Sequence, residues 1–235
     1  MGRDSTLTVR LKPTAATGRD GPAEEQEWVE ARGFPGHVTI DGRGTALGVA
    51  FELGRPGTVW TDGSRQDNGT VGAACVWRTQ DGWTRLHFHL GINNEVFDAE
   101  TFAIYQALGT LGQRRGSDRR YTIIVDSTFA IARIGDDVLG PGQRFGAAAI
   151  EFCSRVLTRN NSVAIRWIPA HSGATGNVVA VEYAKSAATS EDPVEDFPQR
   201  YAAETSFTHM TRVATEARSR ETGERIPARV GPERR

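Results

Sequence analysis

The sequence has 235 residues, a formal net charge of −1 and 38% hydrophobic residues, which is enough for one domain with flanking segments. A charge so near zero gives no sign of a generally basic nucleic-acid-binding protein. No run of apolar residues reaches the roughly 18 that a membrane-spanning helix needs, so we expect no membrane association. The first residues lack the apolar segment of a secretory signal, which predicts an intracellular protein, nuclear or cytoplasmic.

The two cysteines, Cys75 and Cys153, stand within apolar segments. This setting favours buried thiols in a reducing compartment, with a disulfide or a metal-binding pair as the alternative. The basic residues are nearly all arginine, since Lys12 and Lys185 are the only lysines. Arginine suits bidentate contacts to phosphate, although codon bias in a GC-rich genome explains the same preference.

Composition divides the chain into three predicted parts, residues 1–55, 56–190 and 191–235. The first part opens with a polar stretch rich in Gly, Pro, Ala and Glu, which is typical of a linker or a disordered flank. Two short β-rich runs around glycines then predict a hairpin at 37–52. The last part predicts an appended amphipathic helix at 206–226, followed by a charged, proline-containing end.

The middle part has the regular texture of an α/β domain. Three β-rich runs stand at hairpin spacing, and apolar residues at steps of three and four then predict a helix. The predicted strands are 58–64, 71–78, 83–91, 121–127 and 162–172, and the predicted helices are 95–111, 144–159 and 177–188. This order predicts a mixed five-stranded sheet with helices on both faces.

Three acidic residues stand where strand ends meet a helix. Asp62 precedes a turn glycine at the end of the first strand, and Asp126 ends a buried apolar run. Glu100 lies on the apolar face of its helix, where an ionised carboxylate is costly unless it is paired or bound. Asp98 points about 200° away around the helix and is expected to be solvated near the N-terminus. Because functional groups cluster at the carboxyl ends of strands, the three acids predict one site.

Each acid also has an ordinary structural explanation. Asp62 alone could form a turn, Asp126 could belong to a helix cap, and Glu100 could extend to solvent. Their coincidence in one β–β–β–α–β frame favours the functional interpretation. The pair Asp136 and Asp137 faintly resembles the paired aspartates of a polymerase, but it lacks the preceding aromatic residue and predicts a solvated loop.

Four motifs in this order resemble type 1 ribonuclease H: TDGS at 61–64, DAE at 98–100, DS at 126–127 and PAHSGATGN at 169–177. The similarity covers about residues 56–190. It is nearest to the domains of fungal non-LTR retrotransposon polyproteins, whose following segment the C-terminal tail resembles loosely. The resemblance implies the ribonuclease H-like fold and cleavage of the RNA strand in an RNA/DNA hybrid.

The resemblance also implies two divalent cations, Mg²⁺ with Mn²⁺ as a substitute, bound by carboxylates. Asp62 matches the acid that bridges both cations. Glu100 matches the acid that reaches a cation near the ribose 2′-hydroxyl, and Asp126 matches the ligand of the cation that activates water. These three residues are therefore the expected catalytic and metal-binding acids.

Other residues match positions outside the acids. His171 matches the mobile histidine that assists proton transfer or product release, with a solvated loop histidine as the ordinary alternative. Gly63 and Ser64 are expected to offer an amide and a hydroxyl to the substrate strand. Asn94 is expected to contact the minor groove of the hybrid, although an asparagine before a helix is also a common loop former.

The fourth acid of the family is missing, because the motif GN-x-x-A-D ends here in Val181. Val181 shares a predicted helix face with Val178, Ala184 and Ala188, so we expect it to pack on the sheet. Glu182 lies about 100° further around the helix and cannot replace the acid. The second cation is expected to bind poorly, while the fold tolerates the change.

The leading hypothesis is a metal-dependent endonuclease domain for RNA/DNA hybrids, derived from a retroelement and weakened by Val181. The alternative is a hybrid-binding module without turnover or a retroelement remnant. A third class is a structural domain that tethers a polymerase elsewhere in a polyprotein. No polymerase motif is visible, so the chain is expected to be at most a part of a larger reverse-transcriptase polyprotein.

Overall fold

The computed structural model describes residues 33–52, 56–135, 142–189 and 207–222. One six-stranded mixed sheet has the order β1-β6-β5-β2-β3-β4. The strands are β1 (His37–Thr39), β2 (Thr58–Arg65), β3 (Val71–Thr79), β4 (Gly82–Gly91), β5 (Arg120–Val125) and β6 (Ser162–Trp167). The helices are α1 (Arg43–Glu52), α2 (Val96–Gln113), α3 (Thr128–Ile134), α4 (Gln143–Leu157), α5 (Thr175–Thr189) and α7 (Phe207–Thr222).

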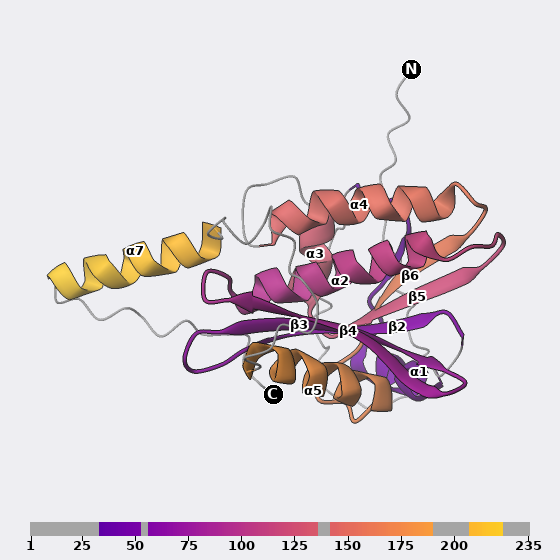
Figure 1. Cartoon of the computed structure of the whole chain (residues 1–235), viewed down its shortest axis with the longest axis horizontal. Helices are drawn as coiled ribbons and strands as arrows, with labels where there is room; N and C mark the ends of the chain where they lie inside the picture. Colours follow the sequence, from indigo (N-terminus) through magenta and orange to yellow (C-terminus); the bar gives the residue numbers. More distant parts are fainter. Residues whose placement is uncertain (1–32, 53–55, 136–141, 190–206, 223–235) are drawn as a thin grey trace, which may run out of the picture.

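Helices cover both faces of the sheet, which confirms the predicted α/β class. Helices α2, α3 and α4 lie over one face, and α1 and α5 lie over the other (Figure 1). The central strand β5 is buried on both sides, because Ile123 and Ile124 point to opposite faces and both are 0% exposed. Ile123 belongs to the larger apolar core under α2 and α4, and Ile124 to the smaller core under α5.

The sheet has six strands and not five, and the predicted hairpin at 37–52 is wrong. β1 pairs in parallel with β6, and the residues that follow it do not form a second strand. These residues form α1 instead, in which Ala46 and Ala50 are buried at a spacing of four residues. Gly44 and Gly48 suggest turns in the sequence, but the packing of α1 overrides their cost of about 1 kcal/mol each in a helix.

α2 is buried on nearly all sides, since it lies between the sheet and α4. Its N-terminus is closed by a capping box, in which the Glu95 N–H donates to Asp98 Oδ2 at 2.8 Å. Asp98 Oδ1 also accepts from the N–H of Gly142 at 3.0 Å. The expectation of a solvated Asp98 is therefore wrong: this side chain is 1% exposed and connects α2 to the start of α4.

Helix α7 lies within the predicted tail helix, and its apolar residues Met210 and Val213 are exposed. The predicted linker at the start of the chain, the pair at 136–137 and the charged end lie outside the described residues. The expected domain boundaries remain predictions. Among the described helices, none combines the length and apolar character needed to cross a membrane.

Candidate active site

Asp62 lies in β2 beside the first turns of α2. The helix approaches the strand closely because Gly63 has no side chain: a Cβ there would lie 2.6 Å from the Glu100 nitrogen and 2.9 Å from the Ala99 Cβ. Asp62 itself is 9% exposed and pairs with β3. β2 and β5 are parallel neighbours, so the carboxyl end of β5 lies at the same end of the sheet. The TDGS motif thus combines Asp62 with Gly63, the glycine that allows α2 and its Glu100 to approach the strand closely.

Ser127 links the other two acids. Its hydroxyl donates to Glu100 Oε2 at 2.6 Å and accepts from the N–H of Ala130 at 3.2 Å, which caps α3. Asp126 stands directly before it and accepts from Asn177 Nδ2 at 3.3 Å. The Asp-Ser pair was open to two explanations, a helix cap and a functional acid. Both apply, to different residues: Ser127 caps α3, and the Asp126 carboxylate lies in the site.

The three acids lie close enough to change one another's ionisation. Burial raises the pKa of Asp62 well above its usual value, and the charges of Asp126 and Glu100 raise it further. Burial raises the pKa of Glu100 to about 7, although the hydrogen bond from Ser127 acts in the opposite direction. Burial also raises the pKa of Asp126, against the hydrogen bond from Asn177. Ionising all three acids is costly without a compensating cation.

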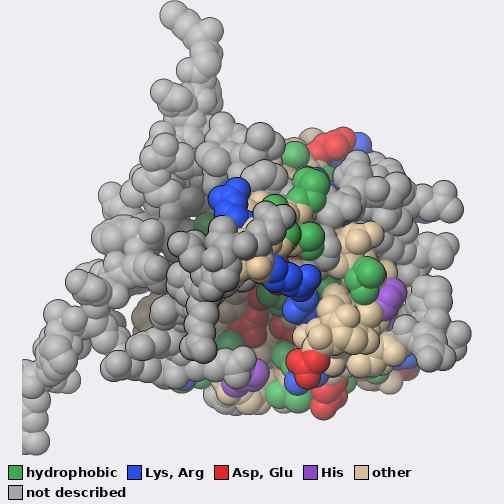
Figure 2. Space-filling view, turned by 90° about the vertical axis from the view of Figure 1, so that its left-hand side faces the viewer, with side chains coloured by type: hydrophobic (Ala, Val, Ile, Leu, Met, Phe, Trp, Pro, Cys, Tyr) green, Lys and Arg blue, Asp and Glu red, His purple; other side chains and the backbone are tan. Residues whose placement is uncertain are grey.

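The donor set fits a divalent cation. Carboxylate oxygens are the ligands that Mg²⁺ and Mn²⁺ prefer. Asn177 adds a buried Oδ1 that has no hydrogen-bond partner within the described structure. No group of three or more His, Cys, Asp or Glu side chains in the described ranges is already arranged around a metal position. Figure 2 shows acidic side chains recessed at this end of the molecule, behind basic ones.

His171 lies on the exposed loop that leads to α5. Its charge lowers the pKa of Asp126, which places the imidazole near that carboxylate. The backbone of His171 has φ 55°, in the left-handed region that costs a non-glycine residue about 1–3 kcal/mol. The next residue, Ser172, has a buried hydroxyl without a partner among the described residues. The structure thus brings a strained, exposed histidine to the edge of the acidic group.

The three residues expected to contact a substrate lie in different settings. Gly63 and Ser64 directly follow the first acid in β2, and Ser64 is 9% exposed. Asn94 is 2% exposed and is used within the protein, because its amide donates to the Leu90 carbonyl at 2.7 Å and accepts from Arg144. Asn94 therefore fixes the loop before α2.

One row of α5 faces the acids. Asn177, Val181 and Lys185 stand at steps of four residues, so they lie above one another on the helix. Asn177 binds Asp126, and the charge of Lys185 lowers the pKa of Asp62. The half-buried Val181 stands between these two contacts. Helix periodicity therefore places Val181 on the side of α5 that faces the acids.

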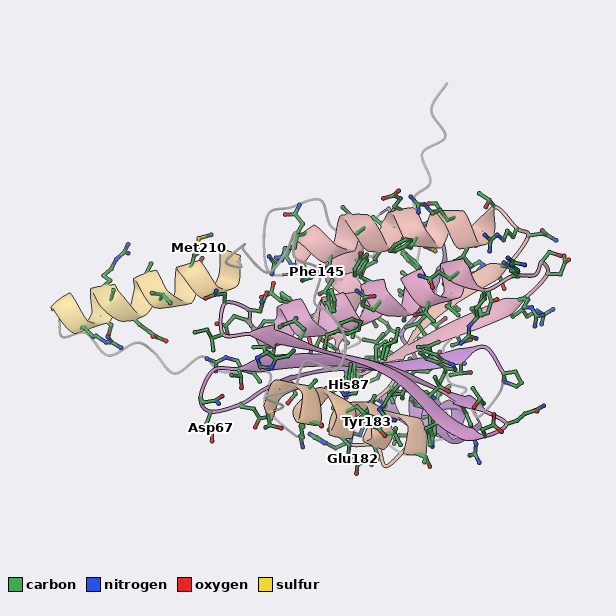
Figure 3. The ribbon with its side chains drawn as sticks, in the orientation of Figure 1. Asp67, His87, Phe145, Glu182, Tyr183 and Met210 are labelled. Carbon is green, nitrogen blue, oxygen red and sulfur yellow. The ribbon has the colours of Figure 1, made fainter. Side chains whose placement is uncertain are left out.

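The predicted packing face of α5 is wrong at Val178, which is 44% exposed. Ala184 and Ala188 are buried as predicted, and Ala180 is buried as well. α5 lies so close to β3 that a Cβ at Gly72 would be 2.4 Å from the Ala184 carbonyl oxygen. Figure 3 shows Glu182 on the outer side of α5, away from the sheet. Glu182 is exposed, which agrees with the expectation that it cannot replace the fourth acid.

Three residues of the site carry no individual prediction from the sequence: Asn177, Ser127 and Lys185. Asn177 follows Gly176, where a Cβ would lie 2.2 Å from the Trp60 ring, so this glycine sets the closeness of α5 to β2. A polar residue directly after such a glycine, at the start of a helix, is the sequence feature that could have indicated a role for Asn177 in the site. Lys185 carries no comparable signal in the sequence, because only the tertiary structure places its charge near Asp62.

Comparison with known proteins identifies a family. A family model described as RNase H matches residues 55–189, which is more than half of the chain. The chain is similar to the structure of RNase H1 from the halophilic archaeon Halobacterium salinarum, with 20% identity and a TM-score of 0.44 over 55% of this chain and 95% of that chain. It is also similar to the N-terminal RNase H domain of rv2228c from Mycobacterium tuberculosis, with 20% identity and a TM-score of 0.43 over 56% and 98% of the two chains. No protein with a curated description matches.

Proposed function

Because the chain belongs to the RNase H family, we propose that residues 56–190 form a metal-dependent endonuclease that cleaves the RNA strand of RNA/DNA hybrids. The observation that carries this proposal is the group of buried acids, Asp62, Glu100 and Asp126, whose pKa values are raised. Such domains recognise helix shape, 2′-hydroxyls and phosphates more than base sequence. This mode of binding suits a chain with almost no net charge but many arginines.

Divalent cations, Mg²⁺ or Mn²⁺, would bind to Asp62, Glu100 and Asp126 and supply a nucleophilic water and stabilisation of the leaving oxygen. The chain prepares these ligands before any cation arrives. Asn177 holds Asp126 through one amide hydrogen bond and keeps its free Oδ1 in the same buried space. Ser127 holds Glu100 at 2.6 Å. Each acid outside β2 therefore has a neutral partner that orients it.

Proton transfer falls to His171 in this proposal. The side chain is exposed, lies near Asp126, and belongs to the residue type that exchanges protons near neutral pH. Its strained backbone at φ 55° is the kind of local cost that persists at functional loops. The group is suited to receive or donate a proton at the edge of the site.

The activity is expected to be weakened because Val181 occupies the place of the fourth acid. Valine supplies no charge and no metal ligand, although it stands between Asn177, which donates to Asp126, and Lys185, whose charge lowers the pKa of Asp62. Val181 equally supports the second candidate, a hybrid-binding module without turnover. The proposed retroelement origin, with the chain as part of a reverse-transcriptase polyprotein, rests on the sequence motifs alone.

The test is cleavage of a labelled RNA/DNA hybrid with Mg²⁺ or Mn²⁺ by the chain and by Val181→Asp. A lost ligand that costs roughly 3 kcal/mol in the transition state reduces the rate by more than a hundredfold, so the variant should gain about that factor. Ser186→Asp is the matched control, since it adds a carboxylate to an exposed position of the same helix. Glu100→Gln in the Val181→Asp background should remove the gain.

Two results decide between the candidates. If Val181→Asp cleaves no faster than the Ser186→Asp control and both are inactive, the binding-module function is supported. If the unaltered chain already cleaves at the rate of Val181→Asp, Val181 does not weaken the site and another group supplies the fourth ligand.

A further inference from the structure

A basic cavity lies at the end of the sheet opposite to the acids. It has a volume of about 560 Å³ and is formed by the turn between α2 and β5 together with the residues before β2. Figure 1 shows this turn at the right-hand end, away from the hairpin that joins β2 and β3. From Glu100 to Gln113, α2 rises by about 20 Å at 1.5 Å per residue, so the cavity is remote from the acidic site.

The cavity is lined by four arginines: Arg114, Arg115, Arg119 and Arg120. Arg114 is half-buried, and the other three are exposed. The ion pairs of the described residues involve other arginines, so none of these four forms an ion pair with a carboxylate of the described ranges. The acid in the cavity wall, Asp118, already accepts hydrogen bonds from Ser117 and Asn160. The hydrogen bonds lower the pKa of Asp118, so its carboxylate contributes one negative charge against the four arginines. Among the described residues, the cavity lining therefore has a net positive charge, in a protein of net charge −1.

The arginines are presented by a fixed backbone. The Arg114 guanidinium lies 5.3 Å from the centre of the Trp77 ring, and Arg159 donates to the carbonyl of Arg114 at 2.8 Å. The N–H of Arg119 donates to Asn161 Oδ1 at 2.9 Å. Because these contacts already restrict the turn, it loses less conformational entropy when a ligand binds. An anion bound between the guanidinium groups also relieves their mutual repulsion.

We propose that this cavity is a second anion site, which binds the phosphate groups of a nucleic-acid strand or of a free phosphate compound. Guanidinium groups match phosphate oxygens with paired hydrogen bonds, and several donors around one cavity can share a ligand with more than one phosphate. The volume falls within the range of small-ligand sites. The site uses none of the acids and is about 20 Å from Glu100 along α2, so it does not depend on the proposed hydrolysis.

The full chain is titrated without divalent cations, first with inorganic pyrophosphate and then with a single-stranded oligothymidylate of roughly 12 nucleotides. The test variant is Arg115→Gln with Arg120→Gln, because both side chains are exposed and their loss leaves the core intact. It should bind at least tenfold more weakly, and its oligonucleotide affinity should fall less steeply with salt. The same two positions changed to lysine keep the charge but lose the paired hydrogen bonds, so binding should be intermediate.

The matched control is Arg43→Gln with Arg220→Gln, which removes two exposed charges outside the cavity and should bind as the unaltered chain does. Saturable pyrophosphate binding that the Gln pair loses would show that free phosphate suffices. Loss confined to the oligonucleotide would assign the site to a strand backbone. The proposal is overturned if neither probe binds, or if the Gln pair binds like the control. Asp62→Asn should leave this binding unchanged, which separates the outcome from any failure of hybrid cleavage.

Discussion

Glu100→Gln should flatten the dependence of metal-free stability on pH. Burial raises the pKa of Glu100 from its usual 4.5 to about 7 in the folded protein. Below about pH 4.5 the carboxyl group is protonated in both states, so its ionisation costs the fold nothing. As the pH rises through about 7, the folded protein has to ionise a buried acid beside Asp126, and the stability present at low pH is lost. Glutamine stays neutral throughout and avoids this loss.

The size of the effect follows from the shift. A change of about 2.5 pKa units, at 1.36 kcal/mol per unit, corresponds to about 3 kcal/mol between pH 4.5 and pH 8. Asp62 and Asp126 also have raised pKa values and contribute to the slope of both proteins. The difference between the two curves therefore reports Glu100 together with the effect of its charge on the pKa of Asp62. The hydrogen bond from Ser127 survives in the variant, because a glutamine Oε1 can accept it.

The assay is urea unfolding in the presence of a chelator at several pH values, followed by the same series with Mg²⁺. The free energy of unfolding of Glu100→Gln should exceed that of the unaltered chain, and the difference should grow from pH 5 to pH 8 towards about 3 kcal/mol. Mg²⁺ should stabilise the unaltered chain more than the variant at pH 8, because a cation binds only the folded acidic group. Parallel curves without Mg²⁺ would refute the assignment of a raised pKa to Glu100.

Three further predictions concern the same site. Gly63→Ala should destabilise the fold by about 1–3 kcal/mol in chemical unfolding and reduce any hybrid cleavage, because the added Cβ would meet the Glu100 nitrogen at 2.6 Å; an unchanged midpoint would contradict this close approach. Calorimetry of the substrate-free chain should show one weak Mg²⁺ site that is lost in Asp62→Asn and in Asp126→Asn, and two comparable sites would argue against a role for Val181. The chain should prefer RNA/DNA hybrid over duplex DNA of equal length, with affinity that falls as salt is added, whereas equal binding of both duplexes would indicate a general charged surface.

Much of the central sheet could be predicted because its local signals agree with its tertiary structure. The apolar run that ends at Asp126 is a buried central strand, and the hairpin-spaced runs pair as β2, β3 and β4. The region at 37–52 could not be predicted in the same way. Its strand is only three residues long and pairs with β6, more than 100 residues later in the chain, so no local pattern indicates the partner.

The site shows a similar division between local and distant information. The motif sequences locate Asp62, Glu100 and Asp126. In an α/β sheet the carboxyl ends of parallel strands lie at one edge, which brings residues from different motifs together. The prediction of a solvated Asp98 is wrong because helical geometry gives the direction of a side chain but not the group that it meets. Here that group is the N–H of Gly142. The prediction that Val178 packs on the sheet is wrong for a similar reason. The small residues of α5 that lie against β3 set the rotation of the helix about its axis, and this rotation leaves Val178 exposed.

If Val181 replaces a fourth acid, as proposed above, the electrostatics of the site explain how the fold tolerates the change. The acidic group is already costly, because burial raises the pKa of each of its three members. A fourth carboxylate between Asn177 and Lys185 would add repulsion in the absence of cations. Valine avoids this cost, so we expect metal-free stability and cation affinity to change in opposite directions when Val181 is replaced by aspartate. Selection for the fold alone therefore favours valine here, and only a requirement for turnover favours the acid.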